Sequence, residues 1–297
     1  MQKIIQAILQ NELKEDIQSI KEIVGLGSVN KIFDIKGNGG EYILRLNEEA
    51  DKKIEYQKEK WCLDKVLNLG IPTAKVVNIG VEQNLPYMIQ EKITGVNGQF
   101  YNATDKLTIW NTLGKYAKKY HQVKQIEQQE VTQNEFHKNW QARLAYNIKE
   151  LNEKDSLLKQ AILTPKEQQL SRTALMRLKD KAFQVGLVHG DLCPRNVICS
   201  KTAIYLLDWG TAEINVVPHV EIGILLMSEE AKGEAFANFL EGLEISKIEY
   251  DSILPEIKLL NYLHRLDKYR WAETYDIEQI EIYEKKVRDT FEELEIS

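Results

Sequence analysis

The chain is organised around the segment Leu187-Val188-His189-Gly190-Asp191-Leu192-Cys193-Pro194-Arg195-Asn196-Val197-Ile198, which is followed by an apolar run ending in Asp208-Trp209-Gly210. Apolar runs flank the His-Gly-Asp motif and its turn, and another leads into Asp208. This pattern predicts short strands joined by tight connections. Because all three polar side chains stand at strand ends, we expect Asp191, Asn196 and Asp208 to converge on one site.

These side chains fit phosphoryl transfer from a nucleotide, which depends mainly on positioning and charge neutralisation. Asp191 can accept the proton of an attacking hydroxyl, and Asn196 with Asp208 offers the oxygen ligands that Mg²⁺ prefers. Each piece alone is also typical of an ordinary strand-to-turn connection or a solvated strand end. Their order and spacing together favour the catalytic interpretation. We interpret His189 as an orienting or packing residue rather than a base.

The same residues carry a resemblance to a known family. Asp191 and Asn196 are five positions apart, the spacing in the kinase catalytic loop, and Asp208-Trp209-Gly210 stands where that fold has Asp-Phe-Gly. The pattern resembles the aminoglycoside phosphotransferase and choline kinase-like family, from about Gly25 to Asp208 by motif. The resemblance implies an α+β, bilobal, protein kinase-like fold. It would have a small N-terminal lobe with an antiparallel sheet and a large, mainly helical C-terminal lobe.

The N-terminal lobe is expected to cover the nucleotide with a hairpin. Residues 31–35 and 41–46 are β-type runs joined by a glycine-rich turn, a pattern that predicts two paired strands. Strand alternation separates Arg45 from the apolar face to which Leu44 and Leu46 belong. A cation among apolar neighbours needs an acidic partner.

The resemblance implies what this cation does. Arg45 takes the place of a Lys, or in many members an Arg, that touches the α- and β-phosphates and pairs with an acid on the next helix. Glu59 matches that acid, with Glu55 as a competitor. Arg keeps the charge but changes reach and geometry, which bears on nucleotide affinity and preference. Backbone groups at Gly27 and Ser28 would cover the phosphates, although this corner by itself is also typical of a plain turn.

An apolar strand at residues 86–91 runs into a glycine-containing connector, which predicts a hinge between the lobes. By resemblance, main-chain groups around Gln90 and Lys92 hydrogen-bond the adenine edge, and Ile89 lies at the back of the pocket. The predicted division is an N-lobe at residues 1–93, a hinge at 94–98, and a C-lobe with the catalytic loop and acceptor site at 99–297.

Helical periodicity predicts further elements. Ile4–Ile23 is interpreted as one amphipathic helix, residues 104–121 as a core helix, and the chain after Gly210 as entering a helix that begins near Pro218. Members of the family usually have an Asp near Glu221 that braces the catalytic loop, so Glu221 is a candidate brace. The last helices carry acidic residues that either line a cleft for a cationic acceptor or only form a solvent-exposed helix face. These residues are Asp267, Glu273, Asp276 and Glu278.

The composition argues against several function classes. The chain has 297 residues and a formal net charge of −6, whereas nucleic-acid binders present a basic surface. An acidic surface suits a cationic small substrate. The apolar run Ile222–Met227 is far too short to cross a bilayer, and no export signal is visible. The 3 cysteines have no metal-ligand spacing or secretory framework. We therefore expect a cytoplasmic protein, monomer or dimer, without nucleic-acid or membrane partners.

The sequence predicts a phosphotransferase that uses ATP or GTP with Mg²⁺ and acts on a hydroxyl of a polar or cationic small molecule. An aminoglycoside-type antibiotic is the first acceptor class, which would make the protein a resistance enzyme. A metabolic kinase for choline, homoserine or a sugar amine stays open. A nucleotide-binding pseudokinase also stays open, although the presence of Asp191, Asn196 and Asp208 together argues against it. Protein phosphorylation is disfavoured, because no activation-loop-like segment follows Asp208.

Overall fold

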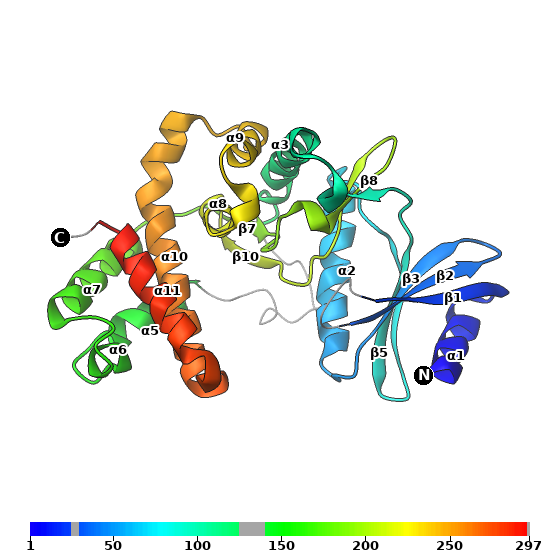
Figure 1. Cartoon of the computed structure of the whole chain (residues 1–297), viewed down its shortest axis with the longest axis horizontal. Helices are drawn as coiled ribbons and strands as arrows, with labels where there is room; N and C mark the ends of the chain where they lie inside the picture. The colour runs from blue at the N-terminus through cyan, green and yellow to red at the C-terminus, as the bar shows by residue number, and fades with distance from the viewer. Residues whose placement is uncertain (25–29, 125–139, 296–297) are drawn as a thin grey trace. The chain divides into compact units, whose positions relative to one another are not determined.

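The computed structural model describes residues 1–24, 30–124 and 140–295. Strands gather in the N-terminal part of the chain and helices dominate the C-terminal part (Figure 1). These residues form two compact units: the first holds 1–24, 30–112 and 191–212, and the second holds 113–124, 140–190 and 213–295. The predicted α+β class, with an N-terminal antiparallel sheet and a helical C-terminal part, is confirmed. The lobe boundaries at residues 93 and 98 stay a prediction.

The first unit is built on a five-stranded antiparallel sheet with the order β1-β2-β3-β5-β4. Its strands are β1 (Ile17–Ile23), β2 (Lys31–Gly37), β3 (Glu41–Leu46), β4 (Val76–Glu82) and β5 (Leu85–Glu91). The predicted hairpin is confirmed, since β2 and β3 pair in register from Lys31 opposite Leu46 to Lys36 opposite Glu41. β3 is therefore an interior strand, which holds Arg45 firmly in place.

Two helices cover the opposite faces of this sheet. Helix α1 (Gln2–Leu13) packs Ile8 and its apolar neighbours against the face that contains Leu44. Helix α2 (Lys52–Asn68) packs against β4 and β5 and meets the other face, because Arg45, which alternates with Leu44, reaches Glu59 on α2. Strand alternation thus sends the apolar side chains of β3 into the core and its cation toward α2.

The prediction of one helix over Ile4–Ile23 is wrong. Helix α1 ends at Leu13, Lys14 takes a left-handed conformation with φ 54°, and the chain turns into β1. The register of β1 against β2 shifts between Ile17 and Ser19. Such a bulge inserts one extra residue, so Ile17 and Ile20 face the same core although they are three apart. This strand therefore imitates the spacing of a helix.

Short strands carry the central motifs. In the first unit, β6 (Val96–Asn97), β8 (Val197–Cys199) and β9 (Ile204–Leu206) form a sheet with β8 in the middle. In the second unit, β7 (Val185–Val188) pairs antiparallel with β10 (Glu213–Val216). The helix expected to begin near Pro218 is confirmed as α8 (His219–Leu226), and the strand β10 that precedes it was not predicted. Four residues are too few to show a strand period, and their partner strand is remote in sequence.

The second unit is a helical assembly around one apolar core. Its helices are α5 (Trp140–Glu150), α6 (Ser156–Lys159), α7 (Pro165–Lys179), α8, α9 (Glu234–Leu243), α10 (Lys247–Tyr275) and α11 (Ile280–Glu293). Helix α3 (Ala103–Tyr120) confirms the predicted core helix and continues from the first unit into this one. Within the described ranges, no helix is both long and apolar enough to cross a membrane.

Helices α8 and α10 approach closely at Gly223. The Nδ2 atom of Asn261 donates to the carbonyl oxygen of Gly223 at 3.2 Å. A Cβ atom at position 223 would lie 2.3 Å from Asn261 Oδ1, so any larger residue here would require the Asn261 side chain to move.

Candidate active site

The catalytic loop begins where β7 ends. His189 is fully buried, which confirms that it packs inside the protein. Gly190 has φ 83°, a left-handed conformation that favours glycine because other residues carry a Cβ atom. This turn ends the strand and starts the segment that carries Asp191. The turn η2 (Pro194–Asn196) then returns the chain into β8.

Asp191 and Asn196 are in direct contact. The Asn196 Nδ2 atom donates to Asp191 Oδ2 at 2.9 Å and to the Asp191 carbonyl oxygen at 2.8 Å. An amide nitrogen has two hydrogens, so these bonds use both and leave the Asn196 Oδ1 atom as the acceptor. The short turn thereby fixes the Asp191 carboxylate and orients one oxygen of Asn196 away from it.

Arg195 is a site residue that the sequence interpretation missed. Its Nη2 atom donates to Asp191 Oδ1 at 2.7 Å and to Oδ2 at 3.0 Å. The Arg195 side chain is 50% exposed, so water screens this pair. The sequence feature that could have indicated this contact is the position of Arg195, a cation four residues after Asp191 and across a tight turn.

Asp208 joins the same neighbourhood through the backbone. The N–H of Leu207 donates to the Asn196 carbonyl oxygen at 2.9 Å, which ties the end of β9 to the catalytic turn. Asp208 itself has φ 59°, a conformation uncommon for a residue with a Cβ atom and frequent at functional sites. The negative charge of Asp208 acts on Arg45 and raises its pKa. The three predicted motif residues and Arg45 therefore all lie in the first unit.

Arg45 and Glu59 form the predicted ion pair. Arg45 Nη1 lies 2.7 Å from Glu59 Oε1, and the two side chains are 14% and 2% exposed. The competitor Glu55 pairs with Lys52 instead. Burial by itself would lower the pKa of Arg45, but the Glu59 carboxylate and Asp208 hold that pKa above its usual value. The guanidinium thus stays charged and in place beside Tyr56, 5.4 Å from the ring centroid.

Helix α2 holds both sides of this cluster. Glu59 positions Arg45, and the neighbouring Lys58 donates from Nζ to the Ala212 carbonyl oxygen at 3.1 Å, in the segment that follows Asp208. Both α2 side chains are buried. One helix therefore positions the cation and the end of the Asp-Trp-Gly segment together.

We expect Glu59→Gln to lower the free energy of unfolding by about 3 kcal/mol, because it leaves a buried guanidinium without its acid. Urea denaturation of the purified protein measures this. Glu55→Gln on the same helix is the matched control and should cost under about 0.5 kcal/mol, since the Glu55 side chain is 44% exposed. Equal losses in both variants would contradict a structural role for the Arg45–Glu59 pair.

Glu221 anchors the start of the catalytic loop from within the second unit. Its carboxylate is fully buried and accepts from the N–H groups of His189 at 2.9 Å and Gly190 at 3.4 Å. Tyr120 donates its hydroxyl at 2.8 Å. Burial alone would raise the pKa of Glu221, but the nearby His121 and His189 side chains, with the N–H group that His189 donates, hold that pKa below its usual range. The extra methylene of Glu relative to Asp is accommodated, and the expected brace forms.

The remaining predicted nucleotide contacts lie on β5 and just after it. Ile89 is fully buried, and Gln90 is 9% exposed. The N–H of Lys92 already donates to the Glu41 carbonyl oxygen at 2.9 Å, and its side chain pairs with Asp34 at 2.8 Å. At Lys92 only the carbonyl group is left for the predicted main-chain contact. Gly27 and Ser28 lie outside the described residues.

The donor set fits a magnesium ion held jointly with a nucleotide. The described residues contain no group of three or more His, Cys, Asp or Glu side chains that could hold a metal ion. Mg²⁺ at nucleotide sites usually keeps several waters and takes one or two protein carboxylates together with substrate phosphates. The Asp208 carboxylate and the Asn196 Oδ1 atom match that sparse requirement. Their role as metal ligands stays a prediction.

The antiparallel sheet, the helical C-terminal part and the loop geometry define a kinase-like phosphotransferase fold. A family model described as the phosphotransferase enzyme family (APH) matches residues 20–268, and the chain belongs to this family. A sequence comparison with curated proteins found no match.

Solved structures share the fold over nearly the whole chain. The GDP and kanamycin complex of APH(2")-IIia has a TM-score of 0.68 and 14% identity, covering 97% of this chain and 98% of that one. Aminoglycoside phosphotransferase APH(4)-Ia has a TM-score of 0.67 and 13% identity, covering 98% and 99%. A putative fructosamine-3-kinase from Haemophilus somnus 129PT has a TM-score of 0.64 and 14% identity, covering 99% and 98%. At such identities the likeness shows the fold alone.

Proposed function

We propose that the protein transfers the γ-phosphoryl group of ATP or GTP to a hydroxyl group of a small polar or cationic molecule. One observation carries this proposal. The Asp191 carboxylate is held by Asn196 at 2.9 Å, in the same unit as Asp208 and Arg45, and the charge of Asp208 acts on Arg45. An acceptor base, two oxygen ligands and a phosphate-binding cation are the parts that phosphoryl transfer needs.

In the proposed reaction the hydroxyl oxygen of the acceptor attacks the γ-phosphorus and forms a new P–O bond. The bond from that phosphorus to the β–γ bridging oxygen breaks, and its electron pair leaves with the nucleoside diphosphate. Asp191 accepts the hydroxyl proton. Asn196 and Arg195 keep the Asp191 carboxylate in position. Much of the rate acceleration comes from holding the hydroxyl in line with the phosphorus.

Arg45 binds the α- and β-phosphates, and Glu59 keeps the guanidinium oriented. The end of β5, around Ile89, Gln90 and Lys92, receives the adenine or guanine edge. When bound, Mg²⁺ would neutralise charge on the phosphates, held by Asp208 and Asn196 Oδ1. The GDP complex of APH(2")-IIia and an AMP-PNP complex of APH(4)-Ia support a nucleotide co-substrate.

The first acceptor class we propose is an aminoglycoside-type antibiotic, with resistance as the biological outcome. Kanamycin and hygromycin B are bound in two of the structures that share the fold, and a net charge of −6 suits a cationic molecule. The second candidate is a metabolic kinase, which the likeness to a putative fructosamine-3-kinase supports. A cytoplasmic location and a monomeric or dimeric state stay predictions.

The test is a coupled assay of ADP or GDP release with Mg²⁺ present, run against a panel of aminoglycosides and small hydroxylated metabolites. We expect at least one acceptor to raise diphosphate release above the acceptor-free rate, by at least about 10²-fold over Asp191→Asn with the same acceptor. If no acceptor raised the rate of diphosphate release, and that rate equalled the rate of Asp191→Asn, the proposal would be contradicted.

A further inference from the structure

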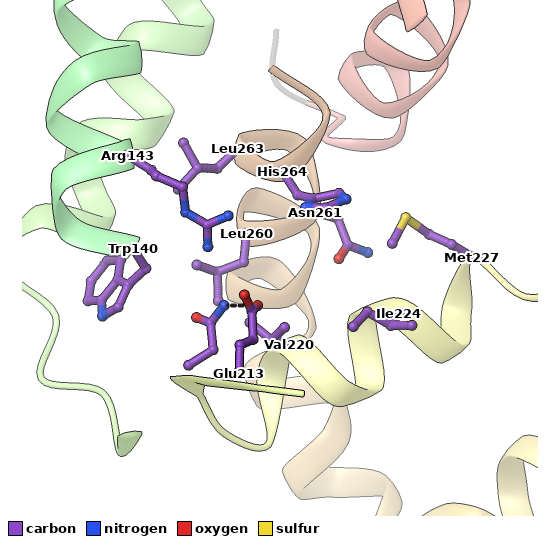
Figure 2. A pocket seen from close by; sticks show the side chains of 11 residues that line it. Trp140, Arg143, Glu213, Val220, Ile224, Met227, Leu260, Asn261, Leu263 and His264 are labelled. Atoms are coloured by element: carbon purple, nitrogen blue, oxygen red, sulfur yellow. Dashed lines mark hydrogen bonds between the residues drawn. The ribbon is translucent and has the colours of Figure 1, made fainter. Parts of the chain in front are cut away.

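Buried polar groups without hydrogen-bond partners mark places where water or a ligand belongs. Among the described residues of the second unit, one such group is Arg143 Nε, 3.4 Å from Asp267 Oδ2. Figure 2 shows Arg143 and Glu213 at the wall of a cavity between α5, β10, α8 and α10. The cavity volume is about 60 Å³, and one water molecule needs roughly 15 Å³. This cavity therefore has room for a few water molecules only.

The first unit has a polar side chain of this kind on β5, Gln90. It is only 9% exposed, yet its amide makes no hydrogen bond to any of the described residues. The other buried polar side chains of this unit all have partners. They are Asn47, Lys58, Glu59, Thr73 and Asn196. A buried amide without partners costs stability unless water or a ligand meets it, so Gln90 is a candidate ligand contact.

Strand alternation places Gln90 on the face of the sheet that carries Arg45. Residues directly opposite each other on paired strands share a face, and Gln90 is opposite Ile43. Arg45 follows Ile43 by two residues and therefore faces the same way. Ile89, next to Gln90, packs into the apolar core with α1 on the other face. Gln90 and the proposed phosphate-binding cation thus lie on one surface of the first unit.

The spacing along this face suits one nucleotide. Two residues of a strand cover about 7 Å, so Gln90 and Ile43 lie about that far along the strands from Arg45. A distance of this order separates the base of a nucleotide from its first phosphates. Ile43 and Ile32, which is paired with Arg45, are half-buried apolar side chains on this face. They offer a flat ring an apolar surface, with Gln90 at its edge.

A charged cluster beside Gln90 is already paired. Lys92 follows Gln90 by two residues, and its Nζ atom lies 2.8 Å from Asp34 Oδ2 and 3.1 Å from Glu41 Oε2. These contacts hold the cation and both acids together. The Gln90 amide, in contrast, keeps its acceptor and its donors for a ligand.

We propose that the Gln90 side chain contacts position 6 of the purine base and lets the protein use ATP and GTP alike. Adenine carries an amino donor at this position, and guanine carries a carbonyl acceptor. A glutamine amide has one acceptor oxygen and one donor NH₂ group, and half a rotation exchanges them. No described residue fixes the Gln90 amide in one orientation. This inference rests on the proposed function and deepens it, because it names the nucleotide preference.

The test is calorimetric titration of the full-length protein with Mg²⁺ and nucleotides that differ at position 6 of the base. ATP has an amino group there, inosine triphosphate a carbonyl oxygen, and purine riboside triphosphate neither. We expect ATP and inosine triphosphate to bind within about fivefold of each other, and GTP within about tenfold of ATP. Purine riboside triphosphate should bind about 5- to 10-fold more weakly than ATP, the usual effect of losing one neutral hydrogen bond.

Two variants assign the effect to Gln90. An ionised carboxylate only accepts hydrogen bonds, so Gln90→Glu at pH 8 should raise the ratio of the inosine triphosphate Kd to the ATP Kd about 10- to 100-fold. This ratio cancels losses that affect all nucleotides alike, such as misfolding or repulsion of the phosphates. Gln90→Met should bind all three nucleotides with equal affinity. Gln6→Glu on α1 is the matched control, since Gln6 is exposed, and it should leave the ratio unchanged.

The outcomes distinguish this inference from the proposed function. An unchanged ratio in Gln90→Glu, or an equal shift in Gln6→Glu, would overturn the assignment of Gln90. A preference of the unmodified protein for one purine above about 100-fold would do the same. The expected pattern without phosphoryl transfer to any acceptor would support the assignment and count against the proposed function. Transfer with a ratio that Gln90 does not affect would support the proposed function and overturn this inference. No nucleotide binding at all would overturn both.

Discussion

Asp208→Asn is expected to abolish the dependence of nucleotide binding on Mg²⁺ and to lower turnover by at least about 10³-fold. The substitution replaces the Asp208 carboxylate with a neutral amide, which keeps one oxygen but removes the full negative charge. Without that charge the phosphates lose the neutralisation on which transfer depends. Titrating ATP or GTP at several Mg²⁺ concentrations measures the effect directly. The unmodified protein should bind more tightly as Mg²⁺ rises, and the variant should not.

Asn is the better replacement here because Asp208 has φ 59°. Asn tolerates the left-handed region more readily than Ala, so its effect reports the lost charge rather than backbone strain. Asp64→Asn is a matched control in the same unit, since Asp64 forms an exposed pair with Lys60 on α2. An unchanged Mg²⁺ dependence in Asp208→Asn would remove Asp208 from the proposed metal site.

Local patterns sufficed to predict much of the architecture. The β2–β3 hairpin, the helical period of α3 and the spacing from Asp191 to Asn196 all depend on neighbours in the sequence. Predicting the Arg45–Glu59 pair required more than local pattern. Alternation on β3 leaves one cation facing α2, and the resemblance to the family indicated which acid it would pair with. Glu55 is one helical turn away and was equally available by spacing.

What the sequence did not predict depends on contacts between distant segments. A bulge in β1 gives the strand helical spacing, and β10 is a strand only because β7 lies beside it. The four groups around Glu221 come from two segments that are both remote from it in the sequence, so their convergence has no local signature. The same holds for the cavity between α5, β10, α8 and α10. Only the fold brings Arg143 and Glu213 to one place.

Asp191→Asn is expected to lower turnover by about 10²- to 10⁴-fold while ATP or GTP still binds, because the change removes the group that accepts the hydroxyl proton. Asn has nearly the same shape, so the turn with Asn196 should persist. Steady-state rates with a coupled assay, together with nucleotide titration, measure both quantities. Wild-type turnover in this variant would remove Asp191 from the mechanism.

Arg195→Met separates the chemical role of Asp191 from its positioning. The carboxylate remains, but the donor at 2.7 Å is gone, so only the Asn196 contact still orients it. Because the Arg195–Asp191 pair is half-exposed, its loss should cost about tenfold in turnover, well below the effect of Asp191→Asn. A loss as large as that of Asp191→Asn would mean that Arg195 itself contacts the transferred group, since weaker orientation of an intact base cannot equal its removal.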